Sequence, residues 1–239
     1  MAATDLPGSE PPGSDPSRSD PGRSDPSRFE PGRCEPGGGI VLLAGPPGSG
    51  KGTQCERLAR AHGWGHLSSG ELFRDEIARR TPLGHRLATS MDSGALVPDD
   101  LTVDVVLGAL DAIRVDNVLL DGFPRTLRQA HALLDRVNGQ GVRLVVELVV
   151  APSVSFERLA LRSRSDDDTS AIRLRLALYE SQTRPALDWL AGLGLVVTVD
   201  GDQAPEVVGA AIERRLAPID PARSAPGSSS ASASSASSA

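Results

Sequence analysis

The sequence predicts an α/β fold with a five-stranded parallel sheet and helices on both of its faces. Three observations lead to this prediction. Short apolar segments rich in Val and Leu alternate along the chain with segments of helical periodicity. Most of these apolar segments lack the polar–apolar alternation of a half-exposed strand, which is typical of strands covered on both sides. The first of them runs into a glycine-rich loop that precedes a helical segment, an order typical of phosphate-binding α/β proteins.

Five segments are the candidate strands. Four are apolar runs, and a weaker one lies just after the first predicted helix: 40–44, 117–121, 143–150, 195–199 and, as the weaker candidate, 65–68. Helical segments separate these strands, so the connections are expected to be right-handed crossovers between parallel strands.

Helical periodicity fills the gaps between the strands. The predicted helices cover 51–62, 70–80, 83–92, 99–113, 125–138, 153–161, 169–191 and 204–216. Pro185 lies inside the longest of them, and we expect it to bend that helix because proline cannot donate a backbone hydrogen bond. Two helices within 70–92 are more than the alternation of strands and helices requires. They are predicted to form an insertion.

Both ends of the chain differ in composition from its centre. Residues 1–38 are rich in Pro and Gly, and from residue 14 they repeat with a period of five (SDPSR, SDPGR, SDPSR, FEPGR, CEPGG). Residues 217–239 are mainly Pro, Ala and Ser. Such segments bury too little apolar surface to fold, so both are predicted to be disordered tails. A docking or regulatory role for the first tail is the alternative. Residues 39–216 hold 20 basic and 23 acidic residues and are long enough for one domain.

Composition also argues against several classes of protein. No apolar run approaches the ~20 residues of a membrane helix, and the N-terminus lacks the features of a secretory signal. The nearly neutral centre argues against nucleic acid as a partner. Cys34 and Cys55 form no CxxC pair, which argues against a disulfide framework or a zinc site. We therefore expect a cytoplasmic protein that binds neither nucleic acid nor a membrane.

The segment GPPGSGKGTQ at 45–54 predicts a phosphate-binding loop. Its glycines let backbone N–H groups surround phosphate oxygens, and the following helix adds its positive N-terminus. Lys51 supplies a cation for the β- and γ-phosphates, and it is the single Lys in a chain with 24 Arg. Gly52 follows it, and Thr53 comes one place later than the usual Ser or Thr. This departure disfavours a GTPase or a motor ATPase.

Four segments resemble the adenylate kinases, which are P-loop kinases of nucleoside monophosphates. In chain order they are the loop at 45–54, HLSSGELFRDE at 66–76, NVLLDGFPRTLRQA at 117–130, and RSDD at 164–167 with Arg175 beyond it. GALVPDD at 94–100 and VDGDQ at 199–203 also fall in the expected places. The resemblance covers 39–216 and implies a short-lid enzyme of the P-loop kinase fold. It further implies a helical AMP-binding insertion at about 68–97 and a vestigial lid at about 162–166.

The resemblance implies the reversible, Mg²⁺-dependent reaction ATP + AMP = 2 ADP, carried out by a monomer, and it assigns roles to individual residues. The implied catalytic residues are Lys51, Arg125, Arg164 and Arg175. The implied ATP-binding residues are Gly48, Ser49, Gly50, Lys51, Gly52, Thr53, Arg158, Arg162 and Gln203. The implied AMP-binding residues are Ser69, Arg74, Ala95, Leu96, Val97, Gly122, Phe123, Pro124, Arg125, Gln129, Arg164 and Arg175. Asp121 is expected to hold Mg²⁺ through water.

Two positions favour AMP as the acceptor. By resemblance, the position of Gln129 is Gln in adenylate kinases and Asn in UMP/CMP kinases, and Ser69 keeps the hydroxyl that the latter lack. The Gln129 amide offers one acceptor and one donor, which suits the N1/N6 edge of adenine. Two alternatives remain open: a UMP/CMP or other nucleoside monophosphate kinase, and an adenylate-binding sensor that has lost turnover. The second follows from the lid, since a single residue separates Arg162 from Arg164.

Overall fold

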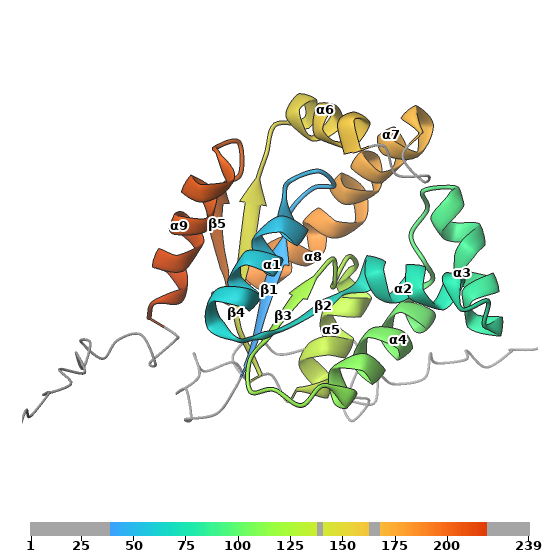
Figure 1. Ribbon diagram of the computed structural model, residues 1–239, viewed down its shortest axis with the longest axis horizontal. Helices are drawn as coiled ribbons and strands as arrows, with labels where there is room; N and C mark the ends of the chain where they lie inside the picture. The colour runs from blue at the N-terminus through green and yellow to red at the C-terminus, as the bar shows by residue number, and fades with distance from the viewer. Residues whose placement is uncertain (1–38, 138–140, 163–167, 219–239) are drawn as a thin grey trace, which may run out of the picture. The chain divides into compact units, whose positions relative to one another are not determined.

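The computed structural model describes residues 39–137, 141–162 and 168–218, and Figure 1 shows their arrangement. Within this part of the chain, one parallel sheet has the strand order β2-β3-β1-β4-β5. The strands are β1 Ile40–Ala44, β2 Gly65–Ser68, β3 Val118–Asp121, β4 Val142–Val149 and β5 Val196–Asp200. The predicted fold class is therefore confirmed. The tail at 1–38 lies outside the described residues, and so does the second tail from 219 onward.

Helices connect the strands as the periodicity predicts. They are α1 Lys51–His62, α2 Ser69–Ala78, α3 Pro82–Asp92, α4 Asp99–Ala112, α5 Leu127–Arg136, α6 Pro152–Arg162, α7 Thr169–Leu178, α8 Arg184–Gly192 and α9 Pro205–Leu216. Helix α5 begins two residues later than predicted because Thr126 caps it, its Oγ1 accepting from the Gln129 N–H at 3.2 Å. No helix among the described residues is long and apolar enough to cross a membrane.

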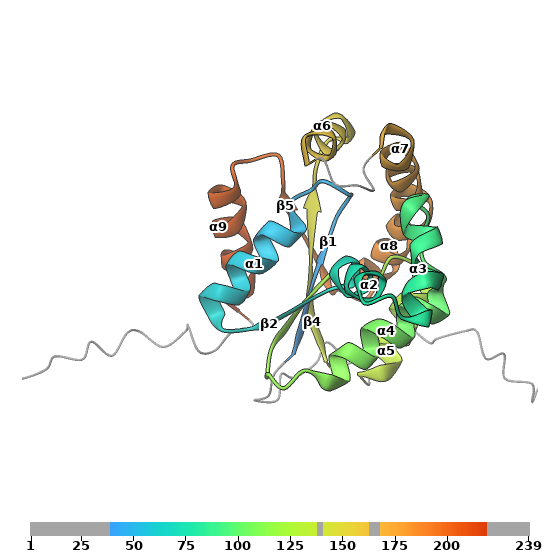
Figure 2. The same cartoon turned by 45° about the vertical axis from the view of Figure 1, so that its right-hand side comes forward.

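The sheet is covered on both faces. Helices α1 and α9 lie on one face, while α4, α5 and α8 lie on the other (Figure 2). The core of the first face combines strand residues such as Val41 and Val146 with Leu58 of α1 and Ile212 of α9. Each of these side chains is nearly inaccessible to water, and so are Leu42 and Val145, the neighbours of Val41 and Val146 that point to the other face, so the strands are apolar on both sides. This burial explains why the sequence shows continuous apolar runs.

The long helix predicted at 169–191 contains a π-helical segment, Tyr179–Thr183, between α7 and α8. The Arg184 N–H donates to the carbonyl of Tyr179, five residues earlier, immediately before Pro185. Proline has no N–H for the preceding turn, and the wider π turn accommodates it. The prediction located the irregularity but not its form, because periodicity gives no information on hydrogen-bond spacing.

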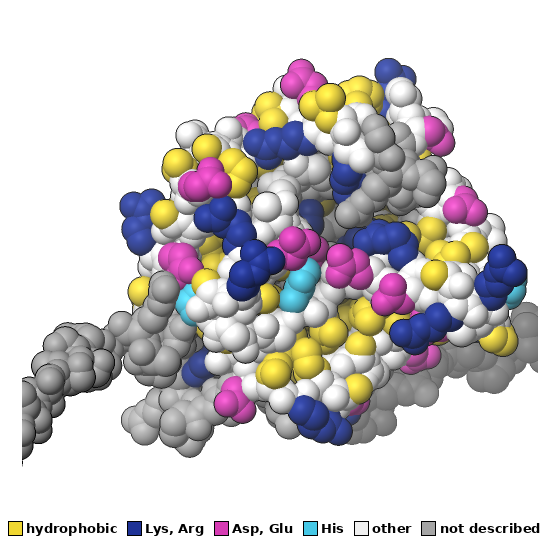
Figure 3. Space-filling view, viewed as in Figure 1, with side chains coloured by type: hydrophobic (Ala, Val, Ile, Leu, Met, Phe, Trp, Pro, Cys, Tyr) yellow, Lys and Arg dark blue, Asp and Glu magenta, His cyan; other side chains and the backbone are white. Residues whose placement is uncertain are grey.

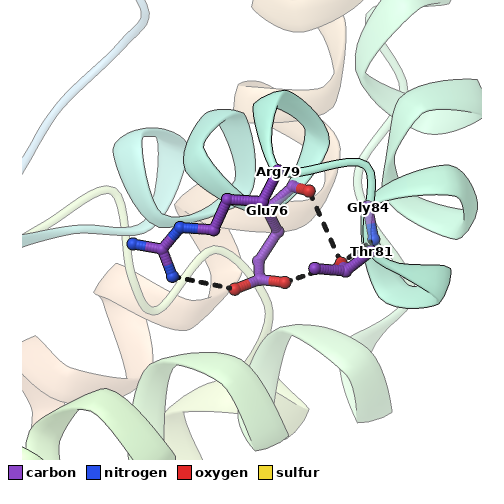
Figure 4. Close-up of polar contacts among 4 residues, drawn as sticks. All are labelled: Glu76, Arg79, Thr81 and Gly84. Atoms are coloured by element: carbon purple, nitrogen blue, oxygen red, sulfur yellow. Dashed lines mark hydrogen bonds and ion pairs between the residues drawn. The ribbon is translucent and has the colours of Figure 1, made fainter.

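Helices α2 and α3 share a small core with the start of α4 and the segment before it, built from Phe73, Leu87, Val97 and Leu101. Thr81 begins α3 by accepting from the Gly84 N–H at 2.8 Å and donating to Glu76 Oε2 at 2.7 Å (Figure 4). The turn is so tight that a Cβ on Gly84 would lie 2.1 Å from the carbonyl oxygen of Glu76. Backbone, rather than a flexible side chain, occupies that space.

We therefore expect Gly84→Ala to lower the free energy of unfolding by at least about 2 kcal/mol, since the helices must move apart to admit the methyl group. Gly108→Ala is the matched control, because Gly108 lies inside α4 with nothing within 4 Å of its Cβ position. That variant should gain about 0.5–1 kcal/mol from helix propensity. Denaturant unfolding measures both changes, and equal stability of the two variants would contradict the packing described.

Candidate active site

A cleft of about 470 Å³ lies at the carboxyl ends of β1 and β3. Strand β1 is hydrogen-bonded to β3 on one side and to β4 on the other. The carboxyl end of β1 is therefore the point where the strand order reverses. Ligands bind at such switch points in open α/β sheets. Figure 3 shows Lys and Arg side chains around this hollow, which suits an anionic ligand.

The loop 45–50, called the P-loop below, forms one wall of the cleft. Gly48 and Gly50 both have positive φ angles, +82° and +90°. A Cβ on Gly48 would lie 2.6 Å from the carbonyl oxygen of Ser155, whereas nothing lies within 4 Å of a Cβ on Gly50. The loop is therefore held against α6 at Gly48, and at Gly50 its backbone has the open space that a phosphate needs.

Lys51 is the first residue of α1. Its Nζ donates to the carbonyl oxygens of Gly45 and Pro46, both at 2.9 Å, and to Ser49 Oγ at 3.3 Å. Burial lowers the pKa of Lys51 to about 8, and the negative charge of Asp121 opposes that shift. The ammonium is thus partly desolvated and held by neutral oxygens, which bound phosphate oxygens can replace.

Asp121 ends β3 and interacts electrostatically with two cations of the cleft. Its charge favours the protonated forms of both Lys51 and Arg125. The start of α1 lies nearby, since a Cβ on Gly52 would be 3.6 Å from Asp121 Oδ2. The cleft thus combines one carboxylate with several cations, and Arg74 and Arg175 act on Arg125 from two further elements.

The loop after β3 positions Arg125. Its Nε donates to the Gly122 carbonyl at 2.7 Å, and that same oxygen accepts from Ser69 Oγ at 2.8 Å. Burial lowers the pKa of Arg125, and the neighbouring positive charges act in the same direction, although a guanidinium keeps its proton. These repelling positive charges, gathered at one place, indicate a site for an anion.

Helix α6 contributes two arginines to the opposite wall. Both Arg158 and Arg162 line the cleft, and Arg158 Nη1 donates to the Gly201 carbonyl at 2.9 Å. Arg162 is the last residue of α6. It is also the first residue of the lid predicted at about 162–166. The rest of that predicted lid, Arg164 included, lies outside the described residues.

Most of the predicted site residues come together in this one cleft. They are Gly48, Gly50, Lys51, Gly52, Thr53, Ser69, Arg74, Ala95, Leu96, Val97, Asp121, Gly122, Phe123, Pro124, Arg125, Gln129, Arg158, Arg162 and Arg175. Two do not line it. Ser49 is 2% exposed, and its hydroxyl accepts from Lys51 at 3.3 Å. Gln203 follows β5, and its exposed amide donates to Asp200 Oδ2 at 2.8 Å.

Tyr179 and Thr183 also line the cleft, although sequence reasoning did not single them out. Thr183 Oγ1 donates to the Arg125 carbonyl at 3.0 Å. Tyr179 donates to the buried Glu147 carboxylate at 3.1 Å, and Arg184 pairs with that carboxylate at 2.5 Å. The four-residue spacing from Arg175 to Tyr179 to Thr183 was the available signal, because it places all three on one helix face.

Comparison with known proteins accords with this geometry. The adenylate kinase family matches residues 43–194, most of the described chain. The chain belongs to the adenylate kinase family. An adenylate kinase of Synechococcus sp. (strain WH7803) is 41% identical over 179 residues, covering 74% of this chain and 98% of the relative. Adenylate kinases of Prochlorococcus marinus (strain MIT 9303) and Thermus thermophilus are 44% and 42% identical, covering 74% and 75% of this chain and 97% of each relative.

Membership of the adenylate kinase family confirms the predicted class of enzyme, a phosphotransferase that acts on adenine nucleotides. The match to the family contains the P-loop, the insertion of α2 and α3, the loop after β3 and α7. Every wall of the cleft described above therefore lies within the part of the chain that carries the family likeness.

Proposed function

We propose that this chain catalyses ATP + AMP = 2 ADP with Mg²⁺, and that the residues of the cleft divide between donor and acceptor nucleotides. The single observation that carries the proposal is the convergence of Lys51, Arg74, Arg125 and Arg175 on one cleft beside Asp121. Phosphoryl transfer needs little covalent chemistry from a protein. It needs two phosphate chains held in line and their negative charge compensated.

The P-loop wall binds the donor in this proposal. Backbone N–H groups of 48–53 surround the β-phosphate, and Lys51 leaves its carbonyl partners for the β- and γ-phosphate oxygens. Arg158 and Arg162 lie across the cleft on α6, where they reach the adenine and phosphates of ATP. Gly201, bonded to Arg158, belongs to the loop after β5 and would lie at the same end. The side chains of Ser49 and Gln203 support the loop and β5, so Ser49 contacts the nucleotide through its backbone N–H alone.

The opposite wall binds the acceptor. Arg74 and Arg125 hold the phosphate of AMP, and Arg175, with Arg164 as its expected partner, bridges the two phosphate chains. Ser69, Gln129 and the segment from Ala95 to Val97 surround the base. The insertion and α7 meet above this wall, since a Cβ on Gly94 would lie 3.0 Å from Ala171 Cα. This contact would exclude water from the transferring group.

The cleft also suits Mg²⁺. Asp121 and the exposed hydroxyl of Thr53 provide hard oxygen donors, and the described residues contain no cluster of three or more His, Cys, Asp or Glu at metal distance. Mg²⁺ commonly binds through one carboxylate, substrate phosphates and water, so this donor set fits it. Bound there, the ion would neutralise charge on the phosphates. A monomer located in the cytoplasm, binding neither nucleic acid nor a membrane, completes the proposal.

The lowered pKa of Lys51 predicts a coupling between nucleotide binding and proton uptake. Bound phosphates favour the ammonium, so they raise its pKa above the value of about 8 in the free protein. At pH 9 Lys51 is mostly neutral before binding and charged afterwards, so ATP binding takes up most of one proton and weakens as the pH rises. Calorimetry in two buffers with different ionisation enthalpies measures this uptake. Lys51→Met should abolish it, and its absence from the wild type would contradict the role of Lys51.

Acceptor selectivity tests the proposed division of the cleft. We expect kcat/KM for AMP to exceed that for CMP or UMP by at least ~10²-fold, since a smaller base would leave unpaired the N–H and the oxygen lone pair that the buried Gln129 amide keeps for a ligand. Gln129→Leu should raise KM for AMP and narrow this gap, with KM for ATP nearly unchanged. Steady-state kinetics with each monophosphate at saturating MgATP gives these ratios.

The same measurement separates the alternatives. Equal activity with CMP or UMP would leave only the broader class of monophosphate kinase. Binding of ATP and AMP without any ADP formation would favour an adenylate sensor. The described cleft keeps its cations in place, which favours turnover over sensing.

A further inference from the structure

Asp99 connects the first turn of α4 to Gln129. Its Oδ1 accepts from Gln129 Nε2 at 2.7 Å and from Thr126 Oγ1 at 2.9 Å. Gln129 is 1% exposed, so protein contacts rather than bulk water determine how its amide is oriented. Asp99 and Gln129 are 30 residues apart, and neither motif of the sequence predicts their contact.

These contacts determine which end of the Gln129 amide is the nitrogen. A carboxylate only accepts hydrogen bonds, so the end that faces Asp99 has to be the NH₂ group. The other end accepts from the backbone N–H of Arg125 at 2.7 Å. Reversing the amide would place its oxygen against the Asp99 carboxylate and its NH₂ against the Arg125 N–H. Both buried contacts would then be lost.

An amide held in this way keeps one N–H and one oxygen lone pair for a ligand, in a fixed order. Adenine offers a donor at its N6 amino group and an acceptor at N1. A 6-oxopurine offers the reverse, an acceptor at O6 and a donor at N1. The two classes of base therefore require opposite orientations of the same amide.

We infer that Asp99 is a positioning residue for base specificity: it orients Gln129 toward 6-aminopurine monophosphates and against 6-oxopurine monophosphates. The inference rests on the proposed binding of AMP at Gln129. Asp99 acts through Gln129 and needs no contact with the nucleotide. Thr126 supports the arrangement from the same side, because its hydroxyl donates to Asp99 while it caps α5.

Asp99→Asn is the sharpest test, because it changes one atom of the side chain and keeps its shape. An Asn amide donates as well as accepts, so it no longer opposes the reversed orientation of Gln129, which then only the Arg125 N–H disfavours. We expect the wild type to prefer AMP over IMP by at least ~10²-fold in kcat/KM, and Asp99→Asn to narrow that ratio by roughly 10-fold, mainly through KM. Asp100→Asn is the control, since Asp100 is exposed in the same helical turn and loses the same charge.

Asp99→Ala is a second variant, which removes the acceptor altogether and should also narrow the ratio. An unchanged AMP-to-IMP ratio in both variants would overturn the role of Asp99 and leave the kinase reaction intact. Equal losses toward AMP and IMP would also overturn it, since they indicate a structural effect without selectivity. A wild type that does not distinguish AMP from IMP would instead overturn the assignment of Gln129 to the base.

Discussion

Lys51→Met should lower kcat by several orders of magnitude while the protein stays folded. Lys51 Nζ is held by two P-loop carbonyls and Ser49 Oγ in the free protein, and in the complex its charge would act on the transferring phosphates. Met fills a similar volume without the charge. It also removes a buried cation, so the variant should be at least as stable as the wild type at pH 7.

Steady-state kinetics and thermal unfolding together measure this effect. Arg60→Met is the matched control, because Arg60 is exposed on the same helix and the substitution removes the same charge. It should retain the wild-type kcat. Near-normal turnover in a folded Lys51→Met protein would contradict the proposed mechanism.

The second large effect is expected at Arg125. Arg125→Ala should lower kcat/KM for AMP by about 10³-fold or more, because its guanidinium would hold the acceptor phosphate and compensate charge as it is transferred. The loop should survive the change, since the Gly122 carbonyl still accepts from Ser69 Oγ at 2.8 Å. KM for ATP should change little, because Arg125 belongs to the other wall of the cleft.

Arg128→Ala is the control for that variant. Arg128 lies three residues along the chain, is exposed on α5 and does not line the cleft. Its removal should leave kcat/KM within about twofold, as is usual for a solvated surface charge. Similar losses in both variants would mean that overall positive charge, rather than the position of Arg125, determines acceptor binding.

The sequence predicts the sheet more accurately than it predicts individual contacts. The structure shows β1, α1 and β2 at the predicted residues, because the P-loop and the glycine after His62 give strong boundaries. The predicted start of α5 was two residues too early because Thr126 caps the helix, and the π-helical segment before Pro185 was not predicted. Local hydrogen bonds determine such details, and an apolar pattern does not encode them.

For the candidate site too, the sequence predicts which segments come together but not the individual contacts of their side chains. Motif spacing identifies most of the residues that meet in the cleft. Three of the motifs lie at the carboxyl ends of neighbouring strands β1, β2 and β3, which meet on the same side of a parallel sheet. Motif spacing does not give the direction of a side chain, so it does not predict that the buried Ser49 hydroxyl accepts from Lys51 and does not line the cleft. Contacts between distant segments, such as Asp99 with Gln129, have no local signature at all.

The most direct test of the central claim is the stoichiometry of the reaction, followed by phosphorus NMR with the purified full-length chain. With MgATP and AMP, two ADP should form for each AMP consumed, without inorganic phosphate, and MgADP alone should approach the same equilibrium from the other side. Failure to form ADP, or release of inorganic phosphate that does not depend on AMP, would contradict the assignment of this cleft to phosphoryl transfer between adenine nucleotides.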